Sequence, residues 1–256
     1  MSSIEVHEIA TAAEGPYGVA VTDDGAVWCT LVHAGVVVRR APSGVLTRIP
    51  LPALAVGPDA PHPQPSQVAA AGDDTVWVTD TTGDRVLLLG PGGVLRSVDA
   101  PAGTQPFGVV STHDGTAWFT GMGTDTLGRI GILGGVASFA SGTLDGLVSM
   151  IAASGDSLWF TANQANVIGY VRGGDASPEL FPVPTPQAGP VGIVVGDDGA
   201  AWFCEILADR IGRVDRQGNF TEFPLPSGSS KPHAIVRDLR ASSGAWLDAI
   251  LGFVTV

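Results

Sequence analysis

Six positions along the chain bear side chains that could surround a ligand, because each occupies the same place in a repeated segment. A site made mostly of aromatic and aliphatic groups with a few polar ones suits a bulky apolar ligand. The only imidazole among them, His233, either contacts that ligand or is satisfied by neighbouring backbone. We take Tyr17, Phe107 and His233 as the substrate-binding residues. The six positions are Tyr17, Ser66, Phe107, Val148, Val191 and His233.

Three further side chains follow the tryptophans of their segments and are expected on the same face: Asp80, Glu205 and His33. The two carboxylates could bind a ligand, although carboxylates at such places also end strands and stabilise turns. His62, in a proline-rich stretch, either reaches a ligand or lies on the surface. The sequence shows no Ser/Cys–His–acid signature and no phosphate-binding loop, so the catalytic residues stay unassigned.

The segments that must position these residues recur with a regular period. They begin at 16, 65, 106, 147, 190 and 232, a period of 41 to 43 residues except for one step of 49 that contains a loop, Ala53–Gln64. Such a period with a tryptophan signature is typical of β-propellers, the alternative being a β-sandwich with unrelated tryptophans. The opening residue lies twelve before the tryptophan in five copies and fourteen before it in the last: Pro16–Trp28, Pro65–Trp77, Pro106–Trp118, Leu147–Trp159, Pro190–Trp202 and Pro232–Trp246.

One copy, residues 189–226, shows the unit most clearly. Short β-branched and aromatic runs alternate with Gly, Asp and Pro, which is the pattern of strands and tight turns. We therefore predict an all-β fold, a β-propeller of four-stranded antiparallel blades with six blades visible, in a single domain over residues 1–256. The runs are Val191–Val195, Ala200–Cys204, Ile211–Val214 and Phe220–Phe223.

The two ends of the chain depart from this unit. Residues 3–9 alternate like an outer strand, and we expect them to complete the last blade and so remove an exposed sheet edge. After Val236 the turn spacing is lost, and we expect a third strand at most.

Composition restricts the partners. The formal net charge is −12 and the pI is near 4.6, which argues against nucleic acid because phosphate binding needs a basic surface. No apolar run is long enough to span a membrane and no signal peptide is visible.

Cys29 and Cys204 fall in two different blades, where a thiol usually acts as a small buried hydrophobe rather than in a disulfide or metal site. We expect a reduced, cytoplasmic monomer.

The residues also resemble a known family. Gly-Pro-Tyr-Gly-Val at 15–19, Gly-Pro-Val-Gly-Ile at 189–193, Lys-Pro-His-Ala-Ile at 231–235 and Ile-Gly-Arg-Val at 211–214 are similar to the virginiamycin B (streptogramin B) lyases. The resemblance covers residues 1 to about 236. It implies a seven-bladed propeller that confers antibiotic resistance, because the family opens cyclic streptogramin B antibiotics at their ester by Mg²⁺-dependent elimination.

The resemblance carries some residue roles over and leaves others open. His233 matches the substrate-contacting histidine of the family's sixth blade. The family's catalytic histidine and metal carboxylates lie in its seventh blade, with a Glu two residues before the histidine, and we expect that blade to be missing. If His233 matched the catalytic histidine instead, Lys231 would replace a metal-binding Glu, and a cation there cannot bind Mg²⁺.

Three functions therefore remain open from the sequence. The first is a streptogramin B lyase-like protein acting on a cyclic peptide, with Mg²⁺ as the implied cofactor and no metal ligands identified. The second is a non-catalytic propeller that binds an apolar ligand or a peptide at the Tyr17, Phe107 and His233 face. The third is another propeller enzyme, such as a metal-dependent lactonase-like hydrolase, for which Asp80 and Glu205 are the carboxylate candidates.

Overall fold

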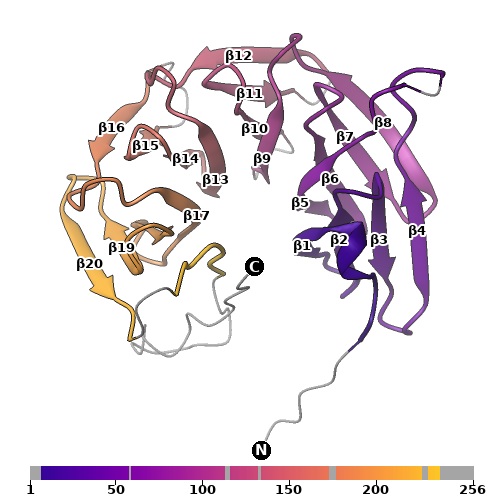
Figure 1. Cartoon of the computed structure of the whole chain (residues 1–256), viewed down its shortest axis with the longest axis horizontal. Coiled ribbons are helices and arrows are strands. Elements are labelled where there is room, and N and C mark those ends of the chain that lie inside the picture. Colours follow the sequence, from indigo (N-terminus) through magenta and orange to yellow (C-terminus); the bar gives the residue numbers. More distant parts are fainter. Residues whose placement is uncertain are drawn as a thin grey trace, which may run out of the picture.

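The structure is a computed structural model that describes residues 7–57, 59–112, 116–131, 134–172, 177–226 and 230–236. These residues form five four-stranded antiparallel sheets arranged around a common axis (Figure 1). In each sheet the four strands are neighbours in chain order, from the innermost to the outermost. The predicted all-β propeller is thereby confirmed.

The innermost strand of each blade faces the axis, and neighbouring innermost strands contact one another from β1 round to β17. Four of the five begin with proline, which lacks an N–H and is tolerated at the first position of a strand. The innermost strands are β1 (Pro16–Val21), β5 (Pro65–Gly72), β9 (Pro106–Ser111), β13 (Val148–Ser154) and β17 (Pro190–Val195).

The second strand of each blade carries the repeated tryptophan. Its β-branched and aromatic residues favour an extended, half-buried conformation. The tryptophans of the first, second and fourth blades are buried, and those of the third and fifth are half-buried. The second strands are β2 (Val27–Leu31), β6 (Thr75–Asp80), β10 (Ala117–Gly121), β14 (Ser157–Ala162) and β18 (Ala201–Glu205).

The third and outermost strands complete the blades, and a short 3₁₀ helix, η1 (Ala12–Glu14), precedes β1. The third strands are β3 (Val36–Arg40), β7 (Arg85–Gly90), β11 (Thr126–Ile130), β15 (Val167–Val171) and β19 (Arg210–Val214). The outermost strands are β4 (Leu46–Pro50), β8 (Gly93–Asp99), β12 (Val136–Ala140), β16 (Glu179–Pro182) and β20 (Phe220–Pro224).

Packing explains why the repeat contains an Ile-Gly-Arg triplet, as the contacts in the fifth blade show. Phe203 pairs across the strands with Gly212, and a Cβ at Gly212 would lie 2.2 Å from the Phe203 ring. The next residue, Arg213, pairs with Trp202, and its guanidinium carbon lies 5.9 Å from the centre of the indole, within cation–π range. The third and fourth blades repeat the Phe–Gly pairing. The motif therefore couples a large ring to the one residue that leaves room for it.

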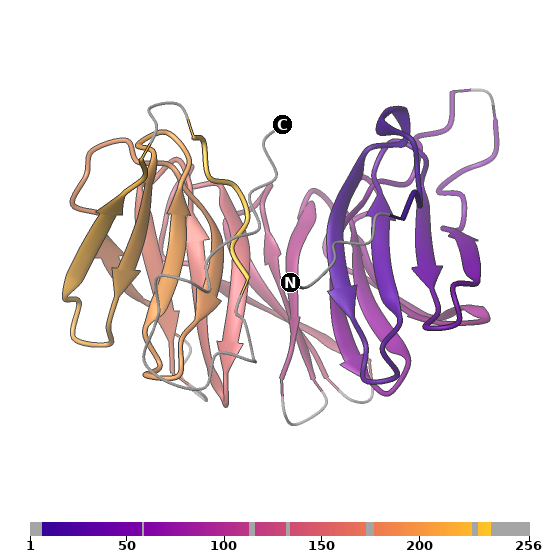
Figure 2. The same cartoon turned by 90° about the horizontal axis from the view of Figure 1, so that it is seen from below.

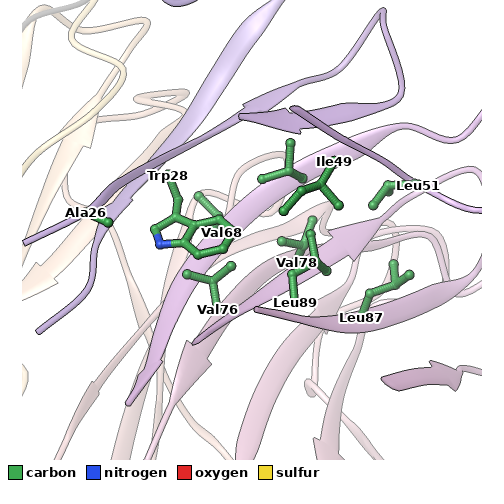
Figure 3. Close-up of a cluster of buried hydrophobic side chains, with 10 residues drawn as sticks. Ala26, Trp28, Ile49, Leu51, Val68, Val76, Val78, Leu87 and Leu89 are labelled. Atoms are coloured by element: carbon green, nitrogen blue, oxygen red, sulfur yellow. The ribbon is translucent and has the colours of Figure 1, made fainter. Parts of the chain in front are cut away.

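The hydrophobic core lies between neighbouring blades. Between the first and second blades, Trp28 and Ile49 pack with Val68, Val78 and Leu87 (Figure 3). Comparable clusters join the second blade to the third, the third to the fourth and the fourth to the fifth. Because each cluster draws side chains from two blades, removing one blade would expose the apolar face of the next.

A buried hydroxyl joins neighbouring innermost strands. Thr30 Oγ1 accepts a hydrogen bond from the Gly18 N–H at 2.8 Å and donates one to the Ser66 carbonyl of the next blade at 2.9 Å. Thr79 and Thr120 make the same pair of contacts in the second and third blades. These bonds fix the spacing of the innermost strands, because breaking one would leave a buried polar group without a partner.

Two predictions about the ends meet different outcomes. The sixth copy is described only at residues 230–236, which contain no strand, and the rest of it lies outside the described residues. The predicted outer strand at 3–9 is wrong where it can be seen, because His7–Ile9 form no strand. Ile9 instead packs against Cys29 and Leu31 of the first blade; residues 3–6 lie outside the described part.

The loop Ala53–Gln64 contains no helix or strand among its described residues, as predicted. Across the described ranges, none of the helical structure is long and apolar enough to cross a membrane. Both cysteines are free and buried, as expected for small apolar side chains.

Candidate functional site

A cavity of about 170 Å³ lies at the mouth of the ring where the innermost strands begin. Figure 2 shows this mouth at the upper edge, on the same side as η1 and the loop Ala53–Gln64. The lining comes from blades one, three, four and five and from the segment after β20. It consists of Tyr17, Phe107, Met122, Leu147, Ser149, Met150, Asn163, Val191 and His233.

Backbone conformation directs five of these side chains into the mouth. In each case the residue directly before the opening position of the repeat adopts a left-handed conformation. The left-handed residues are Gly15 (φ 66°), Gln105 (φ 50°), Leu147 (φ 53°), Gly189 (φ 62°) and Lys231 (φ 41°). The lining side chain is found two residues further along in each case: Tyr17, Phe107, Ser149, Val191 and His233.

The three predicted substrate-binding residues meet in one aromatic cluster. The Tyr17 ring stands edge-on to Phe107, with centroids 5.9 Å apart and an interplanar angle of 66°. It stands edge-on to His233 as well, at 5.8 Å and 76°. Both arrangements are favourable for aromatic pairs. The prediction that Tyr17, Phe107 and His233 converge from distant parts of the chain agrees with this geometry.

The polar atoms of Tyr17 and His233 make at most a weak hydrogen bond with each other. Tyr17 Oη lies 3.5 Å from His233 Nε2, at the outer limit of a hydrogen bond. Burial lowers the pKa of His233 and raises the pKa of Tyr17. Both side chains are therefore neutral near pH 7, and each can still donate or accept a hydrogen bond with a ligand.

Most of the remaining lining residues are aliphatic or sulfur-containing, with Met122 and Met150 as adaptable contacts. Asn163 Nδ2 donates to the Pro190 carbonyl at 3.3 Å, which orients the amide at the cavity wall. Ser149 Oγ lies 3.1 Å from Thr161 Oγ1. The site therefore combines a large apolar surface with a small number of oriented polar groups, as small-molecule pockets do.

The fourth copy of the repeat begins one residue later than the sequence predicts, at Val148 instead of Leu147. Val148 pairs with Ala162, as Pro106 pairs with Gly121, so Val148 takes the place of the opening proline. The cause is a shorter turn: Ala152 pairs with Trp159, seven residues on, whereas eight residues separate the corresponding pair in the third blade. The expected lining residue Val148 is consequently buried in the core, and Ser149 lines the cavity.

Ser66 is also not part of the lining. Its side chain is 5% exposed, and its Oγ lies 2.6 Å from Thr81 Oγ1. Five lining residues were missed by the sequence reasoning: Met122, Leu147, Ser149, Met150 and Asn163. The signal for Ser149 was the absent proline in the fourth copy. Leu147 was expected as the opening residue of the fourth copy and not as a lining residue, and the other three carry no repeat signature by which they could have been found.

The remaining candidates lie away from the cavity lining. Asp80 is fully buried, ion-paired with Arg85 at 2.9 Å and hydrogen-bonded to the Gln64 N–H at 2.8 Å, so it holds the strand ends together. The His33 ring packs over the backbone of Gly15. His62 packs likewise over Gly35. None of these three side chains, Asp80, His33 and His62, lines the described cavity.

Glu205 is a fully buried carboxyl group that, unlike Asp80, has no hydrogen-bond partner for either of its oxygens among the described residues. Burial raises the pKa of Glu205 to about 7, the Glu222 carboxylate acts in the same direction, and Arg210 opposes both. Arg210 Nη1 instead lies 3.5 Å from Glu222 Oε2, whereas its counterpart Arg85 pairs with Asp80 at 2.9 Å. With its pKa raised to about 7, Glu205 keeps its proton at mildly acidic pH, where an ordinary glutamate has lost it.

The described residues do not fit a divalent metal site. Among them no group of three His, Cys, Asp or Glu side chains comes close enough to bind a metal ion. The cavity lining contains one histidine and no carboxylate, whereas Mg²⁺ prefers oxygen ligands that include carboxylates.

The fold and the cavity together define a β-propeller with a cavity at one mouth of the ring. The sequence profile of the Virginiamycin B lyase family matches residues 2–250. The chain therefore belongs to the virginiamycin B lyase family.

Individual relatives agree with this assignment. A virginiamycin B lyase of Nocardia farcinica is 35% identical over 239 residues, covering 91% of this chain and 77% of the relative. A crystal structure of virginiamycin B lyase from Staphylococcus aureus aligns with a TM-score of 0.78 at 34% identity, covering 87% of this chain and 74% of that one. A catalytically inactive S. aureus virginiamycin B lyase with quinupristin aligns with a TM-score of 0.80 at 32% identity, covering 89% and 76%.

Proposed function

We propose that the mouth cavity binds a cyclic depsipeptide of the streptogramin B class and that the protein linearises it by elimination at the ester bond. The observation that carries the proposal is the meeting of Tyr17, Phe107 and His233 across the mouth, with ring centroids 5.9 Å and 5.8 Å apart. Membership of the virginiamycin B lyase family supports it. Further support comes from the aligned S. aureus relative, whose crystal structure was determined with quinupristin.

The proposed chemistry constrains the site. In the elimination a base takes the proton α to a carbonyl, the C–O bond on the alcohol side of the ester breaks, and a carbon–carbon double bond and a carboxylate form. The base then returns its proton to the carboxylate or to solvent, and no described lining residue is assigned as this base. No water is added, so the linear product has the mass of the substrate. A neutral imidazole suits the contact role that we assign to His233, because it avoids placing a cation against an apolar ligand. The described residues do not fit Mg²⁺, because no three His, Cys, Asp or Glu side chains among them come close enough to bind a metal ion.

Turnover can be followed by incubating the protein with quinupristin, with Mg²⁺ and separately with EDTA, and separating the products by chromatography before mass spectrometry. We expect a linear isomer of unchanged mass, and a loss of roughly tenfold or more in its rate of formation in His233→Ala, because the contact between the imidazole and the ligand is lost. His33→Ala is the matched control, because His33 is exposed and lies outside the cavity lining. A product heavier by one water would indicate hydrolysis and contradict the elimination.

A second function is favoured by the absence of carboxylates from the described cavity lining. In this alternative the propeller binds an apolar ligand or peptide without turning it over. Saturable quinupristin binding with no linear product at any Mg²⁺ concentration would support it and would contradict the lyase.

The expected cellular role follows from the same proposal. A lyase acting in the cytoplasm as a monomer would protect its host, and the two free, buried thiols suit a reducing compartment. Expression in a susceptible strain should raise the inhibitory concentration of a streptogramin B antibiotic, whereas expression of His233→Ala should not.

A further inference from the structure

We propose that Asp209 is the positioning residue for His233, holding the histidine at the mouth through the backbone of Lys231. The inference rests on the proposed function, in which His233 contacts the ligand. Asp209 lies in the turn between β18 and β19, outside the cavity lining. Its Oδ1 accepts a hydrogen bond from the Lys231 N–H at 2.8 Å, and its carbonyl accepts one from the Leu225 N–H at 2.9 Å.

The same device recurs at the corresponding turn of the three preceding blades. In each, a left-handed Asp or Asn before the third strand accepts a backbone N–H from the segment that enters the next blade. The bonds are Asp84 Oδ1 to Gln105 N at 2.7 Å, Asp125 Oδ1 to Val148 N at 3.2 Å, and Asn166 Oδ1 to Gly189 N at 3.3 Å. Each segment held in this way contains a residue that lines the cavity, and the segment held by Asp209 contains His233.

The Asp209 carboxylate holds a residue whose backbone conformation is strained. Lys231 has φ 41°, a left-handed conformation that is unfavourable for a residue other than glycine because its Cβ crowds the backbone. Two of the other segments avoid this strain by using Gly15 and Gly189. Without the Asp209 carboxylate, Lys231 can relax to an extended conformation, and His233, two residues on, would leave its position beside Tyr17.

The fifth blade supplies a second hold on the same segment. Where the first three blades have a bridging threonine, this blade has Cys204, and the Gly192 N–H donates directly to the His233 carbonyl at 3.1 Å. A Cβ at Gly192 would lie 2.5 Å from that carbonyl. Ile235 packs against Cys204 and Ile211. In the described part of the chain, blade five thus fixes the backbone of His233, and Tyr17 faces its ring.

The test compares Asp209→Ala with Asp209→Asn in the full chain. Asparagine keeps the accepting oxygen, and Asn166 shows that it can do so in the fourth blade. We expect Asp209→Ala to weaken quinupristin binding about tenfold, the equivalent of one lost hydrogen bond to a charged group, and Asp209→Asn to remain within about twofold of wild type.

A second readout separates positioning from general stability. The pKa of His233, followed by NMR of the imidazole without ligand, should rise towards its ordinary value in Asp209→Ala, because the ring loses the burial that lowers it. Asp24→Ala is the control: Asp24 holds a turn next to β2 and pairs with Arg39, so it should lower the melting temperature without moving the His233 pKa.

An unchanged His233 pKa in folded Asp209→Ala would overturn the proposal. If the alanine variant fails to fold, Asp209→Ser provides the same comparison, because its shorter side chain cannot reach Lys231. The two proposals can fail separately. Wild-type protein that does not bind quinupristin would refute the proposed function, while the ligand-free NMR readout would still decide the role of Asp209.

Discussion

Replacing Glu205 with glutamine should stabilise the protein at neutral and alkaline pH. Glu205 is fully buried with no hydrogen-bond partner on either oxygen among the described residues. Burial and the nearby Glu222 carboxylate raise its pKa from 4.5 to about 7. Glutamine has the shape of the protonated acid and carries no charge at any pH.

The magnitude follows from linkage between protonation and folding. Below pH 4.5 the group is protonated in both states, so it contributes nothing to the pH dependence. Between pH 4.5 and about 7 the folded state keeps the proton and the unfolded state loses it, so the free energy of unfolding falls as the pH rises. A pKa raised by about two and a half units corresponds to about 3 kcal/mol.

Urea unfolding of wild type and Glu205→Gln near pH 4.5 and pH 8 measures this difference. We expect the two proteins to have similar free energies of unfolding at the lower pH, and the variant to be more stable by about 3 kcal/mol at about pH 8. Glu179→Gln is the matched control, because Glu179 is exposed on β16 and should change neither value. A stability difference between wild type and Glu205→Gln that is the same at both pH values would refute the reasoning.

Two further substitutions test the packing of the blades. Cys204→Thr should raise the free energy of unfolding by about 1 kcal/mol, because a hydroxyl there can donate a second hydrogen bond to the His233 carbonyl, as the bridging threonines of the first three blades donate to the next blade. An unchanged urea midpoint would count against this bond. Gly212→Ala should lower it by about 2 kcal/mol, because its Cβ would lie 2.2 Å from the Phe203 ring. Gly92→Ala, which meets no atom within 4 Å, is the control, and equal losses in both alanine variants would contradict the packing argument.

The repeat made the fold predictable from the sequence. Each repeat contains a proline, a tryptophan and an Ile-Gly-Arg-like triplet at fixed spacing, and these residues mark its successive strands. Short turns between the strands predict that neighbours in the chain pair antiparallel, and all five described blades have this strand order. The same regularity placed Tyr17, Phe107 and His233 together, although 216 residues separate the first from the last.

The predictions that failed did so where a local exception mattered. A turn shorter by one residue moved the fourth copy and exchanged Val148 for Ser149, since a shift of one residue reverses which side chain faces the axis. Residues 3–9 alternate like a strand, but the described part of that segment, residues 7–9, forms no strand, and Ile9 packs against the first blade.

The roles of Glu205 and Asp209 depend on contacts that no single sequence displays. Glu205 occupies the same strand position as Asp80, yet its arginine turns to Glu222 instead. Asp209 resembles any turn aspartate until the structure shows which N–H it accepts. In both cases the distinction lies in the partner rather than in the residue type.

The most direct test of the account is calorimetric titration of quinupristin into the wild-type protein and into Phe107→Ala. We predict saturable binding at one site, weakened roughly tenfold or more when the Phe107 ring is removed from the cluster with Tyr17. Leu95→Ala, an exposed apolar side chain on the outermost strand β8, should bind as wild type does. Equal affinity of all three proteins would contradict the assignment of the mouth cavity as the ligand site.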